Sequence, residues 1–142
     1  MSFEERNTWV YAVVTLVAFG VYLVVVLGRA QDAPVADVPY VATMLWTIGA
    51  GIAAAIAGRI LIAVRWPEDA DKRDQRDREI DRFGEYVGQS LVVIGALAAL
   101  ILAMAEVDHF WIANAIYVAF VLSALLSSTA KIFAYRRGFP PW

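Results

Sequence analysis

The chain has 142 residues, of which 61% are hydrophobic and 18% are charged, and its net charge is −2. A soluble domain is about 45–50% apolar and about 25% charged, so this composition is typical of a membrane protein. The absence of cysteine excludes disulfides, thiolate metal sites and cysteine nucleophiles. The slightly acidic balance gives no support to direct nucleic-acid binding, and the length allows a single domain.

Four stretches of 20 to 22 residues contain no Asp, Glu, Lys or Arg: 7–28, 38–58, 86–105 and 110–130. A helix needs about 20 apolar residues to cross a hydrocarbon core of about 30 Å. Backbone in lipid must satisfy its own hydrogen bonds, so each stretch should be helical. We therefore predict an all-α, polytopic integral membrane protein. Its single domain, 1–142, would be an antiparallel four-transmembrane-helix bundle, with helices at about 8–28, 39–64, 85–105 and 110–134.

The first helix is expected to be retained rather than cleaved as a signal peptide. Its apolar stretch is longer than the 7–15 residues of a signal peptide's hydrophobic region. Glu4 and Glu5 also interrupt the positively charged segment that would precede such a region.

Basic residues predict the orientation. The loop 65–85 and the C-terminal tail hold most of them, whereas the loop 29–38 holds only Arg29 and the turn 105–109 holds none. Under the positive-inside rule, both termini and the loop 65–85 lie in the cytoplasm. We expect a multi-pass protein of a bacterial inner membrane, in contact with membrane lipids.

The loop 65–85 contains eight acidic and six basic residues. Pro67 suits the first turn of a helix, so we expect a charged loop helix lying over the bundle or against a partner. Gly84 and Gly88 could act as a hinge. Mixed charge suits a protein partner better than anionic lipid, although a solvated connector is the alternative. The candidate docking residues are Asp74, Arg76, Asp77, Arg78, Glu79, Arg136 and Arg137.

Polar residues within the predicted spans form a second candidate site. Asn114, Tyr117 and Ser128 share one face of the fourth helix, and Gln89 on the third helix could face them. Polar side chains in a bilayer usually point inward. The set would form interhelical hydrogen bonds or line a polar cavity for a small ligand.

Arg59 and Lys131 are candidates for lipid headgroup binding. Arg59 precedes Arg65 by six residues, about 9 Å along a helix. It could extend to the cytoplasmic headgroups, pair with Glu85, or bind an anionic headgroup directly. The same alternatives apply to Lys131.

The turn between the third and fourth spans contains Glu106, Asp108 and His109. Carboxylates and one imidazole could bind a divalent cation, although solvated turn residues are the alternative because no ligand spacing pattern is present. No cofactor is expected. The sequence contains no zinc-protease, phosphate-loop or serine-hydrolase motif, so we do not expect an enzyme.

Small residues line one face of the second and third predicted helices. Such faces allow close packing within one bundle or between copies of a homo-oligomer. A small oligomeric transporter or channel is therefore the alternative function. The residues are Thr43, Thr47, Ala50, Ala54, Ala57 and Gly58 on the second helix, and Gln89, Val92, Ala96, Ala99 and Ala103 on the third.

The run 74–80 (DQRDREI), the following Gly84 and the tail 135–138 (YRRG) carry a family resemblance. They resemble four-helix predicted membrane proteins of unknown function from bacteria and archaea, with actinobacterial relatives similar over nearly the whole chain. Some members are encoded beside small helix-turn-helix regulators, so the resemblance implies a membrane partner of a cytoplasmic protein. It supplies no catalytic residues. The preferred interpretation is a non-enzymatic interaction or sensing component that docks its partner through the loop and the tail 131–142.

Overall fold

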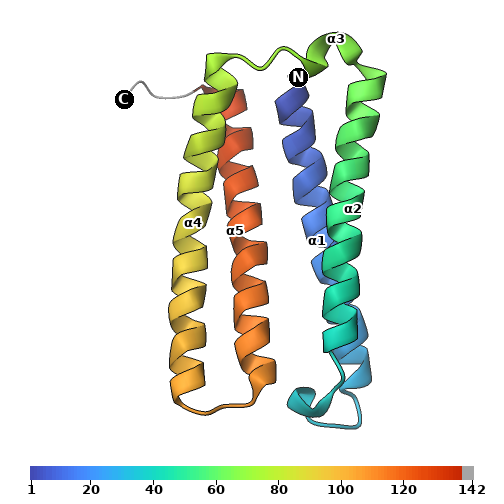
Figure 1. Cartoon of the computed structure of the whole chain (residues 1–142), viewed down its shortest axis with the longest axis vertical. Coiled ribbons are helices and arrows are strands. Elements are labelled where there is room, and N and C mark those ends of the chain that lie inside the picture. The colour runs from blue at the N-terminus through green and yellow to red at the C-terminus, as the bar shows by residue number, and fades with distance from the viewer. Residues whose placement is uncertain (139–142) are drawn as a thin grey trace.

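The computed structural model describes residues 1–138, and this part of the chain contains helices and no strand (Figure 1). Four helices are long and apolar enough to cross a membrane, which confirms the prediction of an all-helical chain with four membrane-length helices. The elements are α1 (Phe3–Arg29), the 3₁₀ turn η1 (Val35–Asp37), α2 (Val41–Arg65), α3 (Pro67–Ala70), α4 (Gln75–Met104) and α5 (His109–Arg137).

The four long helices form two hairpins that lie side by side (Figure 1). Helix α1 packs against both α2 and α5, and α5 also packs against α4. The start of α1, the end of α5, α3 and the start of α4 lie at one end, which we call the charged end. The η1 loop and the turn between α4 and α5 lie at the opposite end. Helices α2 and α4 therefore flank a central pair formed by α1 and α5.

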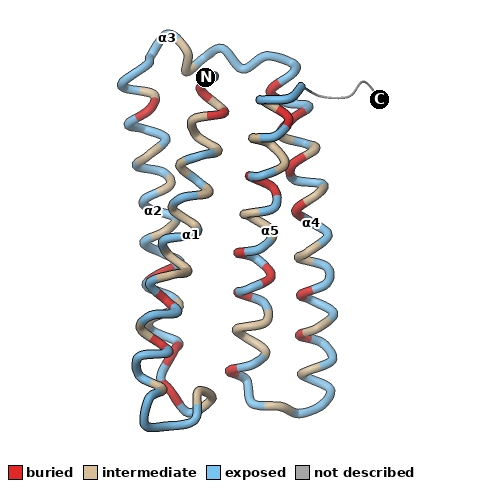
Figure 2. The backbone as a smooth tube through the Cα atoms, turned by 180° about the vertical axis from the view of Figure 1, so that it is seen from behind, coloured by how far each residue is buried: buried red, intermediate tan, exposed pale blue. Residues whose placement is uncertain are grey.

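Large apolar side chains cover the outside of all four helices. Val24 is 73% exposed and Trp46 is 78% exposed, and Figure 2 shows buried positions only thinly scattered along each helix. Lipid tails would cover such surfaces in a membrane, whereas exposing them to water is energetically unfavourable. The main buried apolar cluster lies toward the opposite end and includes Tyr22, Val26, Tyr40, Phe110, Tyr117 and Val121.

Helix α4 begins ten residues earlier than the predicted third span. The loop 65–85 is partly helical, as expected, but residues 75–85 form the first turns of α4 instead of a helix that lies over the bundle. Pro67 starts only the single turn α3, and the chain leaves helical geometry before α4. Asp74 and Asp77 then form a reciprocal capping box, in which each side chain accepts a hydrogen bond from the other's backbone N–H. Such a cap satisfies two of the free N–H groups at a helix start. Ile80, fully buried, anchors the charged extension.

Gly84 and Gly88 do not form a hinge, because α4 continues unbroken through both residues. Both are buried against α5. A Cβ on Gly88 would lie 2.8 Å from the backbone oxygen of Ser123, and one on Gly84 would overlap the side chain of Lys131. These glycines permit close helix approach, as small residues do in membrane bundles.

Candidate functional site

Ion pairs join separate elements at the charged end. Arg6 of α1 lies 3.6 Å from Asp69 of α3, and Arg136 of α5 lies 3.6 Å from Glu5 of α1. Arg6 also stacks on the ring of Trp66, 4.1 Å from its centroid. The two hairpins are therefore connected through side chains as well as through the linker.

Asp77 is structural, which corrects its assignment as a docking residue. Its side chain caps α4 and accepts a 3.0 Å hydrogen bond from the hydroxyl of Tyr135, and only 7% of the residue is exposed. Burial, together with the charge and hydrogen bond of Asp77, raises the pKa of Tyr135. Asp74 is exposed but is similarly used as the cap. The hydrogen bond between Tyr135 and Asp77 holds the start of α4 against the end of α5.

The other predicted docking residues lie at the surface. Arg76 and Arg78 are exposed and form no ion pair within the described residues, while Glu79 accepts a 3.0 Å hydrogen bond from Gln75. Residues 139–142 of the predicted docking tail lie outside the described residues. We call the exposed set, Arg76, Arg78, Glu79, Arg136 and Arg137, the arginine surface.

Lys131 is the centre of an ionic cluster between α4 and α5. Its Nζ lies 2.7 Å from Asp81 Oδ1 and 2.7 Å from Glu85 Oε1, and its side chain is only 14% exposed. Arg73 adds a 2.8 Å bond to Asp81. Burial raises the pKa of Asp81, but Lys131 and Arg73 outweigh burial and leave that pKa below its usual value. Asp81 lies outside the charge-free stretch 86–105, at the charged end.

Arg59 lies between the hairpins and has fewer ionic partners than Lys131. Its only ion pair within the described chain is with Glu4, at 3.7 Å, and its side chain is 54% exposed. It also lies over the ring of Phe3. The predicted alternative of an Arg59–Glu85 pair is not observed, because Glu85 binds Lys131 instead.

Arg59 and Lys131 line the same polar cavity, of about 320 Å³, near the charged end. Ser128, which is 2% exposed, also lines it. The cavity brings together two residues that sequence reasoning treated separately as lipid contacts. Its remaining lining residues are Glu4, Asn7, Thr8, Tyr11, Ala55, Ile56, Arg73 and Asp81.

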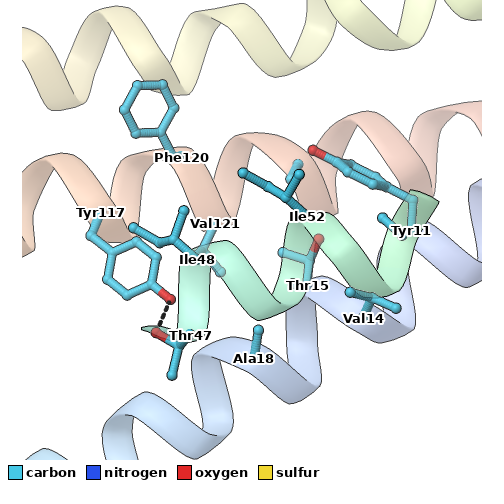
Figure 3. Close-up of a pocket in the computed structure, with 13 residues that line it drawn as sticks. Tyr11, Val14, Thr15, Ala18, Thr47, Ile48, Ile52, Tyr117, Phe120 and Val121 are labelled. Carbon is cyan, nitrogen blue, oxygen red and sulfur yellow. Dashed lines mark hydrogen bonds between the residues drawn. The ribbon is translucent and has the colours of Figure 1, made fainter. Parts of the chain in front are cut away.

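A second cavity, of about 330 Å³, continues from the first toward the opposite end. Tyr11 and Ala55 line both cavities. Figure 3 shows apolar side chains from α1, α2 and α5 surrounding this space, including Val14, Ile52 and Phe120. The two cavities form one groove that is charged at one end and apolar along the rest.

Aromatic and polar side chains close the apolar end of the groove. The hydroxyl of Tyr117 lies 3.4 Å from Thr47 Oγ1 (Figure 3). Tyr22 meets Tyr117 edge to face, with centroids 5.0 Å apart, and donates a hydrogen bond to Asn114. Gln89, which the sequence suggested could face this stripe, is exposed and forms no hydrogen bond with it within the described residues. Interhelical bonding therefore accounts for Asn114 and Tyr117.

Two of the three predicted metal ligands lie close together, with His109 Nδ1 3.7 Å from Asp108 Oδ1, but the three do not form a metal site. Asp108 caps α5 by accepting a hydrogen bond from the N–H of Phe110, and the side chain of His109 is 82% exposed. Glu106 occupies the turn with a φ of 54°. Across residues 1–138, no group of three or more His, Cys, Asp or Glu side chains could hold a metal ion. The Asp108 carboxylate, which a metal site would need, thus caps α5 instead.

The small-residue faces are only partly used in packing. Gly58 of α2 lies so close to Val10 that a Cβ would meet it, whereas Ala54 and Ala57 are exposed. On α4, Ala99 is buried and Ala96 is exposed. A single chain therefore leaves part of each face uncovered.

Comparisons with protein-family models, curated proteins and solved structures found no match to this chain. Its candidate sites are therefore defined by their own chemistry. Sequence reasoning missed Tyr135, Asp81 and Tyr22, whose partners lie 58, 50 and 92 residues away along the chain. Local spacing contains no signal for pairs so distant; only the side-by-side placement of helices creates them.

Proposed function

We propose that this protein is a non-enzymatic component of a bacterial inner membrane that docks a cytoplasmic protein at its charged end. In this proposal the four helices cross the membrane as an antiparallel bundle, with both termini in the cytoplasm. The concentration of Lys and Arg in the loop 65–85 and the tail supports that orientation. The four membrane-length helices support membrane insertion.

The observation that carries the docking proposal is the arginine surface, which lies on helices that are bonded to each other. Arg76 and Arg78 extend from α4 beyond its charge-free stretch, and they have no ion-pair partner in the described chain. The bond between Asp77 and Tyr135 holds that extension against α5. Binding by a fixed surface costs less ordering entropy than binding by a flexible loop.

The charge of the arginine surface defines the partner. Four arginines and one glutamate give it a net positive charge, so its complement is an acidic protein surface. Complementary charge of this kind speeds association and selects among partners. The resemblance to four-helix families encoded beside small regulators supports a small cytoplasmic regulator as that partner. From the same resemblance, in the run 74–80, Gly84 and the tail 135–138, we infer that this chain is a member of those families.

Crosslinking in cells tests this proposal. A photoreactive amino acid at position 79, within the arginine surface, should crosslink to one cytoplasmic protein, which is then identified and purified. Arg76→Glu combined with Arg78→Glu should weaken its binding at least about tenfold, the effect of losing one charge-assisted contact. Asp77 is left unchanged because it caps α4.

Arg65→Glu is the matched control, because Arg65 is exposed at the end of α2, away from the arginine surface. This variant should bind the partner like the original chain. All variants should insert in the membrane equally. Unchanged binding by the double variant, or an equal loss in Arg65→Glu, would contradict docking at the arginine surface.

A small oligomeric transporter or channel is the second candidate, favoured by the exposed small residues of α2. Ala50, Ala54 and Ala57 are uncovered in a single chain. If copies assemble there, Ala54→Leu should dissociate the oligomer and abolish flux into liposomes. A wild-type protein that is monomeric by native mass spectrometry and transports nothing would exclude this function.

A further inference from the structure

We propose that the groove between the hairpins binds one anionic phospholipid, with its phosphate at Arg59 and one acyl chain in the apolar cavity. This proposal does not depend on the docking of a cytoplasmic protein. It assigns an occupant to a groove built from α1, α2 and α5, with α4 contributing at the charged end.

The order of polarity along the groove matches that of a phospholipid. The polar cavity lies at the charged end, and the apolar cavity begins where Tyr11 and Ala55 line both. A phospholipid has its phosphate at the membrane surface and its chains in the interior, in the same order. A free phosphate would fill only the polar cavity and would leave the apolar one without an occupant.

Arg59 is the group that selects an anion. Guanidinium has five N–H donors in a planar fork that matches two phosphate oxygens. Glu4, at 3.7 Å, is its only ionic partner in the described residues, and no hydrogen bond joins the two. Lys131 and Arg73, by contrast, are each held by carboxylates at 2.7–2.8 Å. One cation with free donors suits one negative charge, as in a phosphodiester.

The depth of Arg59 gives a reason for a bound anion. It lies six residues inside Arg65, about 9 Å along α2. A cation at that depth is costly unless it reaches the headgroups or meets a counter-charge. A lipid phosphate drawn into the polar cavity supplies the counter-charge and adds charge-assisted hydrogen bonds.

The apolar cavity is accessible from the lipid side. Tyr11 is 48% exposed, Ile52 is 58% exposed and Phe120 is 56% exposed, so the rim of the groove faces outward. In Figure 3, Val14 and Ala18 line this space on the α1 side, and Phe120 extends from α5 on the side away from α1. An acyl chain could enter sideways from the bilayer without any helix moving apart.

Native mass spectrometry tests the headgroup part. The full chain in mild detergent is mixed with equal amounts of dioleoyl phosphatidylglycerol and dioleoyl phosphatidylcholine, which share chains and differ in net charge. We expect one phosphatidylglycerol per chain, retained at least about tenfold over phosphatidylcholine. Arg59→Gln should remove this preference, and Arg59→Lys should restore part of it because the positive charge returns.

Arg65→Gln is the control, since it removes a charge from the same helix outside the groove. It should keep the preference for phosphatidylglycerol. Equal retention of the two lipids by the original chain would overturn the proposal. The proposal would also be overturned if Arg59→Gln kept as strong a preference for phosphatidylglycerol as Arg65→Gln.

A second pair of variants tests the acyl-chain part. Ala55→Phe places a ring where the two cavities meet, whereas Ala53→Phe adds the same ring to an exposed position on α2 outside both cavities. Ala55→Phe should lose the bound phosphatidylglycerol, and Ala53→Phe should keep it. Circular dichroism and gel filtration verify that each variant is folded.

Inorganic phosphate distinguishes the two sources of the anion. A large molar excess of phosphate should leave the bound phosphatidylglycerol in place, because phosphate gains nothing from the apolar cavity. If phosphate displaces the lipid, or if Ala55→Phe retains phosphatidylglycerol like Ala53→Phe, the site recognises the anion alone and the lipid proposal is overturned.

Discussion

The two hairpins are built from similar apolar sequences yet pack very differently. In the α4–α5 hairpin, three glycines face α5 so closely that a Cβ on any of them would meet a neighbouring atom at 3.0 Å or less. In the α1–α2 hairpin, a Cβ on Gly51 would lie 3.4 Å from Ala18, an ordinary contact, and Gly58 alone is tight. The α4–α5 glycines are Gly84, Gly88 and Gly95.

This difference separates a support from a binding region. Lipid provides no hydrophobic drive for helix association, so close contact and hydrogen bonds must hold membrane helices together. The α4–α5 hairpin has both, through its glycines and the Lys131 cluster. The α1–α2 hairpin packs more openly, and both cavities border it. The tight hairpin carries the arginine surface, and the open one forms most of the groove.

The largest predicted effect contrasts one glycine from each hairpin. In Gly95→Ala the new methyl group would overlap Ala119, whereas in Gly51→Ala it would sit in ordinary contact with Ala18. We expect Gly95→Ala to lower the free energy of unfolding by about 1–3 kcal/mol, the usual cost of overpacking. Gly51→Ala should change it by less than about 0.5 kcal/mol. Unfolding in mixed micelles with increasing dodecyl sulfate measures both, and equal losses would refute the contrast between hairpins.

The next effect concerns the ionic cluster of the tight hairpin. Lys131→Met leaves Asp81 and Glu85 without their shared cation, and we expect a loss of about 1–2 kcal/mol. This is less than for a fully buried pair, because both carboxylates are partly exposed. Lys72→Met, at an exposed residue without an ion pair in the described chain, is the control.

The same variant has a predicted pH dependence. Because the pKa of Asp81 is lowered in the fold, its contribution is present above its ordinary pKa of 3.8 and is lost as the pH falls through the lowered value. The stability difference between the original chain and Lys131→Met should therefore shrink in acid. A difference that grows below that pH would show that Asp81 is not the partner that stabilises the hairpin.

The smallest effect concerns the contact between the hairpins. Tyr22→Phe removes the hydroxyl that donates to Asn114, and membrane hydrogen bonds of this kind average about 0.6 kcal/mol. Tyr11→Phe is the control, because the Tyr11 hydroxyl has no hydrogen-bond partner within the described residues. A double-mutant cycle with Asn114→Ala should assign the loss to this pair. A coupling energy near zero would show that packing of the rings, rather than the hydrogen bond, joins α1 to α5.

The sequence by itself determined the class of protein and the number of long helices. Charge-free stretches of 20 to 22 residues leave the backbone no alternative to a helix in lipid, so counting them was sufficient. The helix boundaries were harder to predict where a helix contains many charged residues. The charge pattern predicts a helix within the loop 65–85, but not that it continues into the third span. The capping box of Asp74 and Asp77 starts a single helix, α4, that includes both.

Only the tertiary structure decided what each charged or polar residue does. Arg76 and Asp77 are adjacent charged residues in the same run, yet Asp77 is buried against Tyr135 while Arg76 is exposed. Arg59 and Ser128 meet in one cavity although they belong to different hairpins. Local periodicity reports the face of a helix, but not the helix that covers that face. Partners 50 or more residues apart are set by how the hairpins pack, and that packing depends on close contacts that no single stretch of sequence contains.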